Sequence, residues 1–280
     1  MNDPILGTAS KLYDFCLWPY EPLTHAAGKR PYSDLLRESF ELAPRPDRLH
    51  SLLKRVQDAL GPQATVWGIK WDGQALSWEL YFYDYARLER SVSIERLRAV
   101  LGQDWTEAPQ LEHIPYFMFS IEVNGSGDIS PGVDVYVGAP GSDVSAGLCY
   151  SCDSEGSRFK NLYHFFDAKR EFEQVLQKLS HSMRLPLPIP CLDELLWEQT
   201  RHCQTLVVAN KSEADGLYYS RVPADQLCWF SRRMDYPAPL CRWLQAERDA
   251  YSHMLFDLGV DFRSRDGRLD FFRGAFYGVA

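Results

Sequence analysis

Short stretches of alternating apolar and polar residues occur in pairs along the chain. In the first pair, VWGIKW (66–71) and LSWELYFYDY (76–85) flank Asp72-Gly73, a turn dipeptide typical of β-hairpins. Four more pairs follow: YFMFSIEV (116–123) with GVDVYVG (132–138), GLCYSC (147–152) with RFKNLYHFF (158–166), TLVVANK (205–211) with LYYSRV (217–222), and VDFRS (260–264) with LDFFRGAFYGV (269–279). The pattern predicts five hairpins and therefore ten strands.

Helical periodicity separates most of these pairs. Asp167 is a plausible N-cap for the helix AKREFEQVLQKL, and Pro223 fits the start of the helix ADQLCWFSRR. The predicted helices span residues 33–42, 47–60, 93–102, 167–182, 191–202, 223–233 and 238–257. The recurrence of hairpins and helices amounts to a weak internal repeat.

The two faces of the predicted strands differ in chemistry. On the strand LSWELYFY, Trp78 and Leu80 alternate with Glu79, Tyr81 and Tyr83. An apolar face can pack under amphipathic helices, whereas a row of tyrosines with scattered charges is typical of a lined lumen. We therefore expect an α+β fold: a ten-stranded antiparallel β-barrel, or a strongly curved sheet, surrounded by α-helices.

The pattern also predicts how the chain is organised. We expect residues 1–280 to form a single domain, in which residues 1–63 are a helical segment that packs on the barrel and 64–280 carry the hairpins and helices. The proline-rich stretch RLPLPIP (184–190) is short and apolar, so we interpret it as a packed connection between helices.

Composition narrows the classes of function. Aromatic residues make up 14% of the chain, and aromatic side chains are frequent in strands and in pockets for organic ligands. The formal charge of −8 argues against sequence-independent nucleic-acid binding, which requires a basic surface. The chain shows no signal-peptide pattern and no apolar run of about 18 residues, so we expect a cytoplasmic protein with no membrane partner.

Familiar cofactor and metal motifs are absent from the sequence. There is no GxGxxG, no GxxxxGK[ST], no GxSxG and no HExxH. Seven cysteines form no disulfide-scaffold pattern. The CxxC stretch Cys149-Tyr-Ser-Cys152 lacks the further ligands that structural zinc requires, so we interpret Cys149 and Cys152 as ordinary strand cysteines. The sequence predicts no cofactor and gives Mg²⁺ no support, because the aspartate-rich motif of magnesium-dependent isoprenoid enzymes is missing.

A lumen lined by phenol rings, cations and a carboxylate suits one kind of chemistry well. Aromatic faces stabilise carbocations, Lys and Arg bind a diphosphate leaving group, and a carboxylate can orient or deprotonate an acceptor. The stretches LDFFRGAFYGV, SRFKNLYHFF, GLYYSRV and WGIKW…WELYFYD resemble the aromatic prenyltransferases of the ABBA, or PT-barrel, class. The resemblance is at the level of pattern and covers roughly residues 64–280.

The resemblance implies roles for particular residues and a pair of substrates. Prenyl diphosphate would be the donor, and an indole, a phenol or a peptide side chain would be the acceptor. Glu79 would lie near the acceptor. The diphosphate would be bound by Lys70, Lys160, Arg221 and Arg273, and the cation would be shielded by Tyr81, Tyr83, Tyr163, Tyr219 and Tyr277.

The sequence departs from that class in one respect and leaves two other functions open. The class repeats helices before each hairpin, whereas only about ten residues, APGSDVSAG and its flanks, separate the second and third hairpins. The first alternative is a non-catalytic barrel that binds an apolar or aromatic small molecule. The second is a cyclase or isomerase of a natural-product intermediate. Fold alone does not decide among them.

Overall fold

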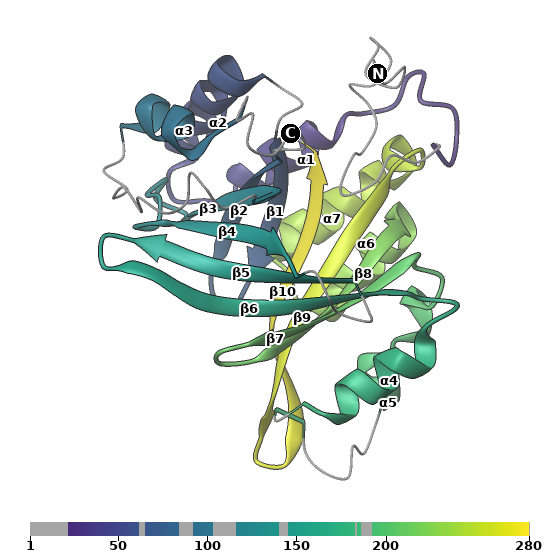
Figure 1. The fold of residues 1–280 in the computed structure, drawn as a ribbon. Coiled ribbons are helices and arrows are strands. Elements are labelled where there is room, and N and C mark those ends of the chain that lie inside the picture. Colours follow the sequence, from purple (N-terminus) through teal and green to yellow (C-terminus); the bar gives the residue numbers. More distant parts are fainter. Residues whose placement is uncertain are drawn as a thin grey trace, which may run out of the picture.

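The ten predicted strands form a closed antiparallel barrel, in which each strand pairs with its neighbours in sequence and β10 pairs with β1 (Figure 1). The computed structural model describes residues 22–61, 65–83, 92–102, 116–139, 145–182, 184–185 and 192–279. Closure pairs the backbone of every strand on both sides and leaves no exposed sheet edge. The strands are β1 (Thr65–Trp71), β2 (Leu76–Tyr83), β3 (Met118–Val123), β4 (Val133–Gly138), β5 (Ser145–Asp153), β6 (Gly156–Asp167), β7 (Thr205–Lys211), β8 (Asp215–Pro223), β9 (Leu255–Arg265) and β10 (Arg268–Val279).

Helices lie outside the barrel, as the pattern predicts (Figure 1). They are α1 (Tyr32–Phe40), α2 (Pro46–Leu60), α3 (Ile94–Leu101), α4 (Phe172–Ser180), α5 (Leu192–Leu195), α6 (Ala224–Arg233) and α7 (Ala238–Glu247), with the 3₁₀ turns η5 (Glu198–Thr200) and η6 (Arg248–Tyr251). Within the described ranges, none of these helices has the length and apolar character needed to cross a membrane.

Three of the expected helices differ from the structure: 167–182, 238–257, and 191–202, which contains only the short α5 and the 3₁₀ turn η5. Pro223 is the N-cap of α6, as predicted, but Asp167 caps no helix. Its carboxylate accepts the backbone N–H groups of Lys169 and Arg170, which makes a turn, and α4 begins only at Phe172. The expected helix 238–257 also ends early: α7 ends at Glu247, the 3₁₀ turn η6 follows, and β9 starts at Leu255.

The early start of β9 has a physical reason in its alternation. Phe256, Leu258 and Val260 are buried on one face, and Gly259 and Asp261 lie between them on the other. This period of two continues into the stretch that we expected to be a strand, so the hairpin β9–β10 is longer than its sequence pattern suggested.

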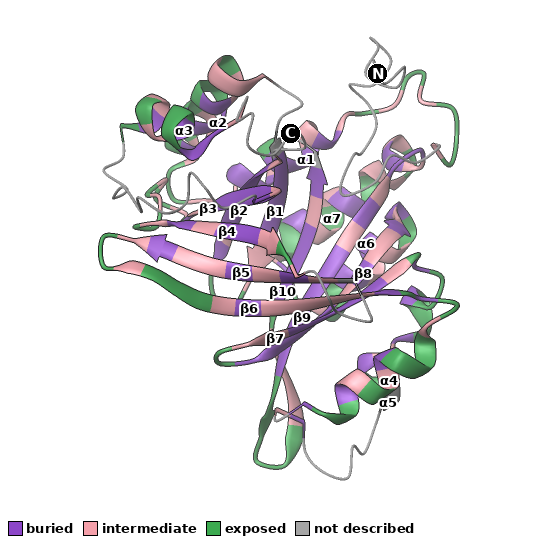
Figure 2. Ribbon diagram, in the orientation of Figure 1, coloured by how far each residue is buried: buried purple, intermediate pink, exposed green. Residues whose placement is uncertain are grey.

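The apolar face of the strands forms the core with the helices. Trp67 on β1 and Phe276 on β10 are fully buried, and their ring centroids lie 6.1 Å apart. Tyr32 of α1 meets Phe256 of β9 edge to face at 4.8 Å. Burial in Figure 2 accordingly concentrates on the strands and on the helix faces that meet them. The described helices therefore pack against the outside of the barrel, chiefly on β1 and on β6 to β10, and the opposite strand face lines the lumen.

Candidate functional site in the barrel lumen

The lumen contains a cavity of about 190 Å³. It lies toward the end of the barrel where the hairpin turns are, since Ser212 and Glu213 of the β7–β8 turn contribute to its wall. Five carboxylates (Glu79, Glu122, Asp134, Glu213, Asp261) and four cations (Lys70, Lys160, Lys211, Arg273) line it. The cavity is therefore strongly polar, yet its charges nearly balance.

A closed ring of five tyrosines crosses the lumen beside this charged layer. Each neighbouring pair of ring centroids is separated by 5.8 to 6.3 Å. The five come from alternate strands β2, β4, β6, β8 and β10, and are Tyr81, Tyr136, Tyr163, Tyr218 and Tyr277. Side chains that point inward from alternate strands form a layer in a small barrel, and here the layer consists of phenol rings.

Glycines on neighbouring strands make room for two of these rings. Gly68 pairs with Tyr277, and a Cβ atom at position 68 would lie 2.7 Å from that ring. Gly259 pairs with Tyr218, where a Cβ atom would lie 2.5 Å from the ring. Both rings therefore lie flat against bare backbone, which no other residue type allows at these two positions.

Glu79 is the most deeply held carboxylate of the cavity. It is 5% exposed, pairs with Lys70, and accepts hydrogen bonds from Ser120 Oγ at 2.5 Å and Tyr136 Oη at 3.3 Å. Burial alone would raise its pKa, but the charges of Lys70 and Lys160 outweigh burial and lower the pKa to about 2. Glu79 is thus an anion at neutral pH, fixed in place by its donors.

Lys70 is held between two carboxylates. Its ammonium pairs with Glu79 and lies 3.4 Å from Glu122, which also accepts a hydrogen bond from Ser77 Oγ at 3.1 Å. Burial opposes its charge, but Glu79 and Glu122 raise the pKa of Lys70 above the ordinary value. Its charge therefore serves mainly to neutralise these two carboxylates.

Lys160 lies closer to the cavity mouth and pairs with Asp134. The Nζ to Oδ2 distance is 2.5 Å, and the lysine side chain is 41% exposed. Burial raises the pKa of Asp134 despite Lys160, whereas Asp134 and Glu79 raise the pKa of Lys160 despite burial. The ammonium is the better stabilised partner, because two carboxylates act on it.

A second cluster, the Asp261 cluster, consists of Asp261, Lys211 and Arg273. Lys211 pairs with Asp261 Oδ1, and Arg273 Nη1 lies 3.7 Å from Oδ2. Arg273 is the directly paired residue on β10, whereas Lys211 reaches Asp261 from β7 across Gly216 of β8. The three side chains therefore meet because the strand between them has no side chain at that position.

Most of the predicted site residues lie together in the lumen. The cavity wall includes Lys70, Glu79, Tyr81, Lys160, Tyr163, Arg273 and Tyr277. Tyr83 packs against the same lumenal cluster but does not line the cavity. Their placement brings them into one site, although it does not by itself assign roles to them.

Tyr219 and Arg221 lie elsewhere, so their expected place in the lumen is wrong. Tyr219 is on the outer face, where its ring stacks on Trp197 at 5.5 Å and its hydroxyl donates to the Leu195 carbonyl. Arg221 is at the far end of β8 and donates to Gln204 Oε1 at 2.7 Å. Tyr219 alternates with the lumenal Tyr218 and therefore lies on the outer face, and a β-bulge between Tyr219 and Val222 adds a residue that breaks the alternation at Arg221.

Sequence reasoning did not select several residues that the lumen uses. Tyr218 was hidden by its neighbour Tyr219, because two adjacent tyrosines on one strand leave the face undecided. Lys211 is the last residue of its strand, just before a turn, and a lysine at such a position is usually interpreted as solvent-exposed. The sequence could have predicted the lumenal position of Tyr136 and Asp134, since they alternate with the buried Val135 on β4.

The two cysteines of the CxxC stretch are free and lie in different environments. Cys149 belongs to the lumenal cluster and Cys152 to the outer core, and burial raises the pKa of both thiols. This agrees with the interpretation as strand cysteines. Among the residues with described positions, no group of three or more His, Cys, Asp or Glu side chains could hold a metal ion.

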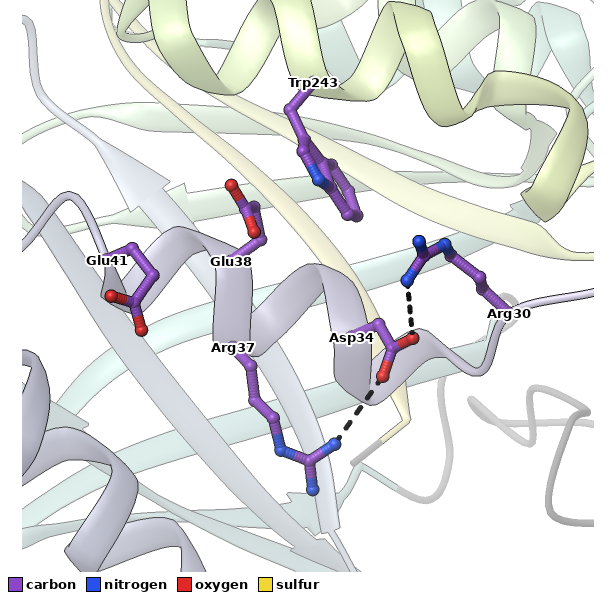
Figure 3. Close-up of a pocket in the computed structure, with 6 residues that line it drawn as sticks. All are labelled: Arg30, Asp34, Arg37, Glu38, Glu41 and Trp243. Carbon is purple, nitrogen blue, oxygen red and sulfur yellow. Dashed lines mark hydrogen bonds and ion pairs between the residues drawn. The ribbon is translucent and has the colours of Figure 1, made fainter.

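A second, shallow depression lies on the surface between α1 and α7 (Figure 3). Asp34 pairs there with Arg30 at 3.2 Å and with Arg37 at 3.7 Å, and Trp243 forms the opposite side. Its charged groups are exposed and largely paired with each other. The lumen, by contrast, buries polar groups such as Glu79 and Asp261 and is the better candidate site.

No protein-family model matches the chain, and comparison with curated proteins finds no match either. The fold and the lumen must therefore define the class of protein by themselves. A ten-stranded, helix-covered antiparallel barrel with a buried aromatic cluster fits a PT-barrel-like protein or a barrel that binds a small ligand.

Proposed function

We propose that this protein transfers a prenyl group from an allylic diphosphate to an aromatic acceptor, as a distant relative of the PT-barrel aromatic prenyltransferases. One observation carries the proposal: the ring of five tyrosines adjoins a layer of lysine and arginine side chains in an enclosed lumen. Cations suit a diphosphate leaving group, and phenol faces suit the carbocation that it leaves behind.

The diphosphate would be bound by Lys160 and Arg273, the most exposed cations of the cavity, and by Lys211, which meets Arg273 at Asp261. Their side chains are 41%, 44% and 17% exposed, whereas Lys70 is 14% exposed and lies between Glu79 and Glu122. Lys211 thus takes the place that the sequence pattern assigned to Arg221. Lys70 would instead keep Glu79 ionised and in position.

The reaction would then proceed by ionisation and capture. The allylic C–O bond breaks, and its electron pair leaves with the diphosphate, whose charge the cations neutralise. The tyrosine ring shields the allylic cation from water, and an electron-rich carbon of the acceptor forms the new C–C bond. The resulting arenium ion loses its proton to Glu79. A carboxylate with a pKa near 2 is a weak base, but an arenium ion is acidic enough to be deprotonated by it.

The size of the cavity favours a short donor. Its volume of about 190 Å³ lies below the ~300–1,000 Å³ typical of sites for drug-sized ligands. We therefore expect dimethylallyl diphosphate to be used in preference to geranyl diphosphate.

Product formation tests the proposal. The purified protein is incubated with dimethylallyl or geranyl diphosphate and a panel of indoles, phenols and aromatic peptides, and mass spectrometry detects a prenylated acceptor. Lys160→Gln should lower kcat/KM by about 10²–10³-fold, the usual effect of losing one electrostatic donor. The matched control is Arg221→Gly, because Arg221 lies outside the lumen and its φ of 66° suits glycine.

One observation favours a second candidate, a non-catalytic barrel that binds a small molecule. The cations of the lumen are paired with carboxylates, so the charges of the cavity nearly balance. A balanced site suits a zwitterionic or aromatic ligand as well as an anion. Absence of product with both donors and every acceptor in the panel would contradict prenyl transfer and favour this candidate.

A further inference from the structure

The carboxylate of Asp261 occupies the space between two cations of the cavity. Asp261 is 6% exposed and touches Lys211 with one oxygen and Arg273 with the other. Among the described residues, its carboxylate oxygens form hydrogen bonds or ion pairs with these two cations alone. Its oxygens therefore lie where the oxygens of a bound anion would have to be.

The Asp261 cluster lies against the bare backbone of Gly216 on one side and reaches solvent through Arg273 on the other. Gly216 faces the Asp261 cluster, and a Cβ atom there would lie 3.0 Å from Asp261 Oδ1 and 3.2 Å from Lys211 Cε. Arg273 is 44% exposed, so its guanidinium can turn toward the cavity without leaving water. Lys211 lies 5.4 Å from the centroid of Tyr218, which keeps the ammonium beside the tyrosine ring.

Glu79 shows what a permanently held carboxylate looks like in the same lumen. It accepts hydrogen bonds from Ser120 and Tyr136 as well as pairing with Lys70. Within the described part of the chain, Asp261 is held by the two cations that an incoming anion would also bind. A polyanion brings more charge and more acceptor oxygens than one carboxylate, and can therefore displace it.

We propose that Asp261 is an internal competitor for the anion site. It holds Lys211 and Arg273 in the empty protein, and an anion must displace its carboxylate before it can bind both cations, so the binding of every anion is weakened. This inference rests on the proposed function for the identity of the anion, but the competition itself requires no transfer reaction.

The test is calorimetry with inorganic pyrophosphate and inorganic phosphate as probes. Asp261→Asn keeps the shape of the side chain and removes its charge, so pyrophosphate should bind about tenfold more tightly than to the parent, and phosphate should gain at least as much. Asp270→Asn is the matched control. Asp270 lies on the same hairpin and pairs with Arg263 at 3.3 Å, and its removal should change both affinities less than about twofold.

An unchanged or weakened pyrophosphate affinity in Asp261→Asn would overturn the inference, as would an equal gain in Asp270→Asn. Because the variant could lose its fold, a second measurement uses the parent protein. The ¹³C carboxyl signal of Asp261 should shift when pyrophosphate saturates the site, since the carboxylate loses both cations. An unmoved signal would also overturn the inference.

These outcomes are separable from the fate of the proposed function. Tighter pyrophosphate binding by Asp261→Asn, in a protein that prenylates nothing, would keep the competitor and reject the transfer reaction. Prenylation by the parent, with no gain in pyrophosphate affinity in the variant, would do the reverse.

Discussion

The outer and the lumenal face of the same strands have different compositions and different roles in this barrel. Phe276 and Tyr277 are neighbours on β10, yet Phe276 is fully buried against Trp67 and Tyr236, whereas Tyr277 belongs to the lumenal ring of tyrosines. The outer face is continuous and apolar, so it stabilises the fold by burial. The lumenal face combines phenols with ion pairs, which are costly to bury and contribute little net stability. A barrel that needed only to be stable would not require that second face.

The largest expected effect is a difference in how much a substitution on each face lowers the free energy of unfolding. Phe276→Ala leaves a cavity in the outer core and should lower the free energy of unfolding by about 3–5 kcal/mol. Tyr277→Phe removes only a hydroxyl from the lumen and should change it by about 1 kcal/mol or less. Urea unfolding followed by circular dichroism measures both. Equal losses would mean that the two faces contribute alike, and the comparison would fail.

A somewhat smaller effect, which depends on pH, is the contribution of Glu79 to the free energy of unfolding. Its pKa of about 2 lies below the ordinary value of 4.5, so the folded state favours the carboxylate. Because its pKa is lowered by folding, ionised Glu79 stabilises the fold at pH values above its pKa in the unfolded chain. This contribution, about 3 kcal/mol in full, disappears as the pH falls from 4.5 toward 2.

The parent should therefore lose stability steeply across that range, and Glu79→Gln should lose less there while being less stable near neutral pH. Urea unfolding at about pH 6 and about pH 3 provides the comparison. Parallel pH profiles for the parent and Glu79→Gln would show that the Lys70–Glu79 pair is not what holds this carboxylate.

Much of the fold was readable from the sequence because alternation and turn chemistry are local signals. Asp72-Gly73 and the alternation of Trp78 and Leu80 with Glu79 and Tyr81 predicted both a hairpin and its two faces, and the structure confirms the barrel built from them. Side chains alternate between the two faces with a period of two, so assigning one side chain correctly to the outer or the lumenal face assigns all others of a regular strand.

The same rule explains where prediction failed. Tyr218 and Tyr219 are adjacent on β8, so the pattern left its faces undecided, and choosing Tyr219 for the lumen placed Arg221 there too and left Tyr218 out. The bulge after Tyr219 adds one residue, so alternation also fails at Arg221. The Asp261 cluster was not predictable either. It forms because strands β7, β9 and β10 meet around Gly216, and such a meeting depends on register between segments that are distant in sequence.

The account's central claim is that the cations of the lumen bind an allylic diphosphate. Calorimetry with dimethylallyl thiolodiphosphate, an analogue that ionises slowly, tests it most directly. The double variant Lys211→Gln/Arg273→Gln removes two lumenal cations, and Arg265→Gln/Arg268→Gln removes two exposed cations from the tip of the same hairpin. We expect the parent and the tip variant to bind equally, and the lumenal variant to bind at least tenfold more weakly. Equal binding by all three proteins, or none by the parent, would contradict the claim.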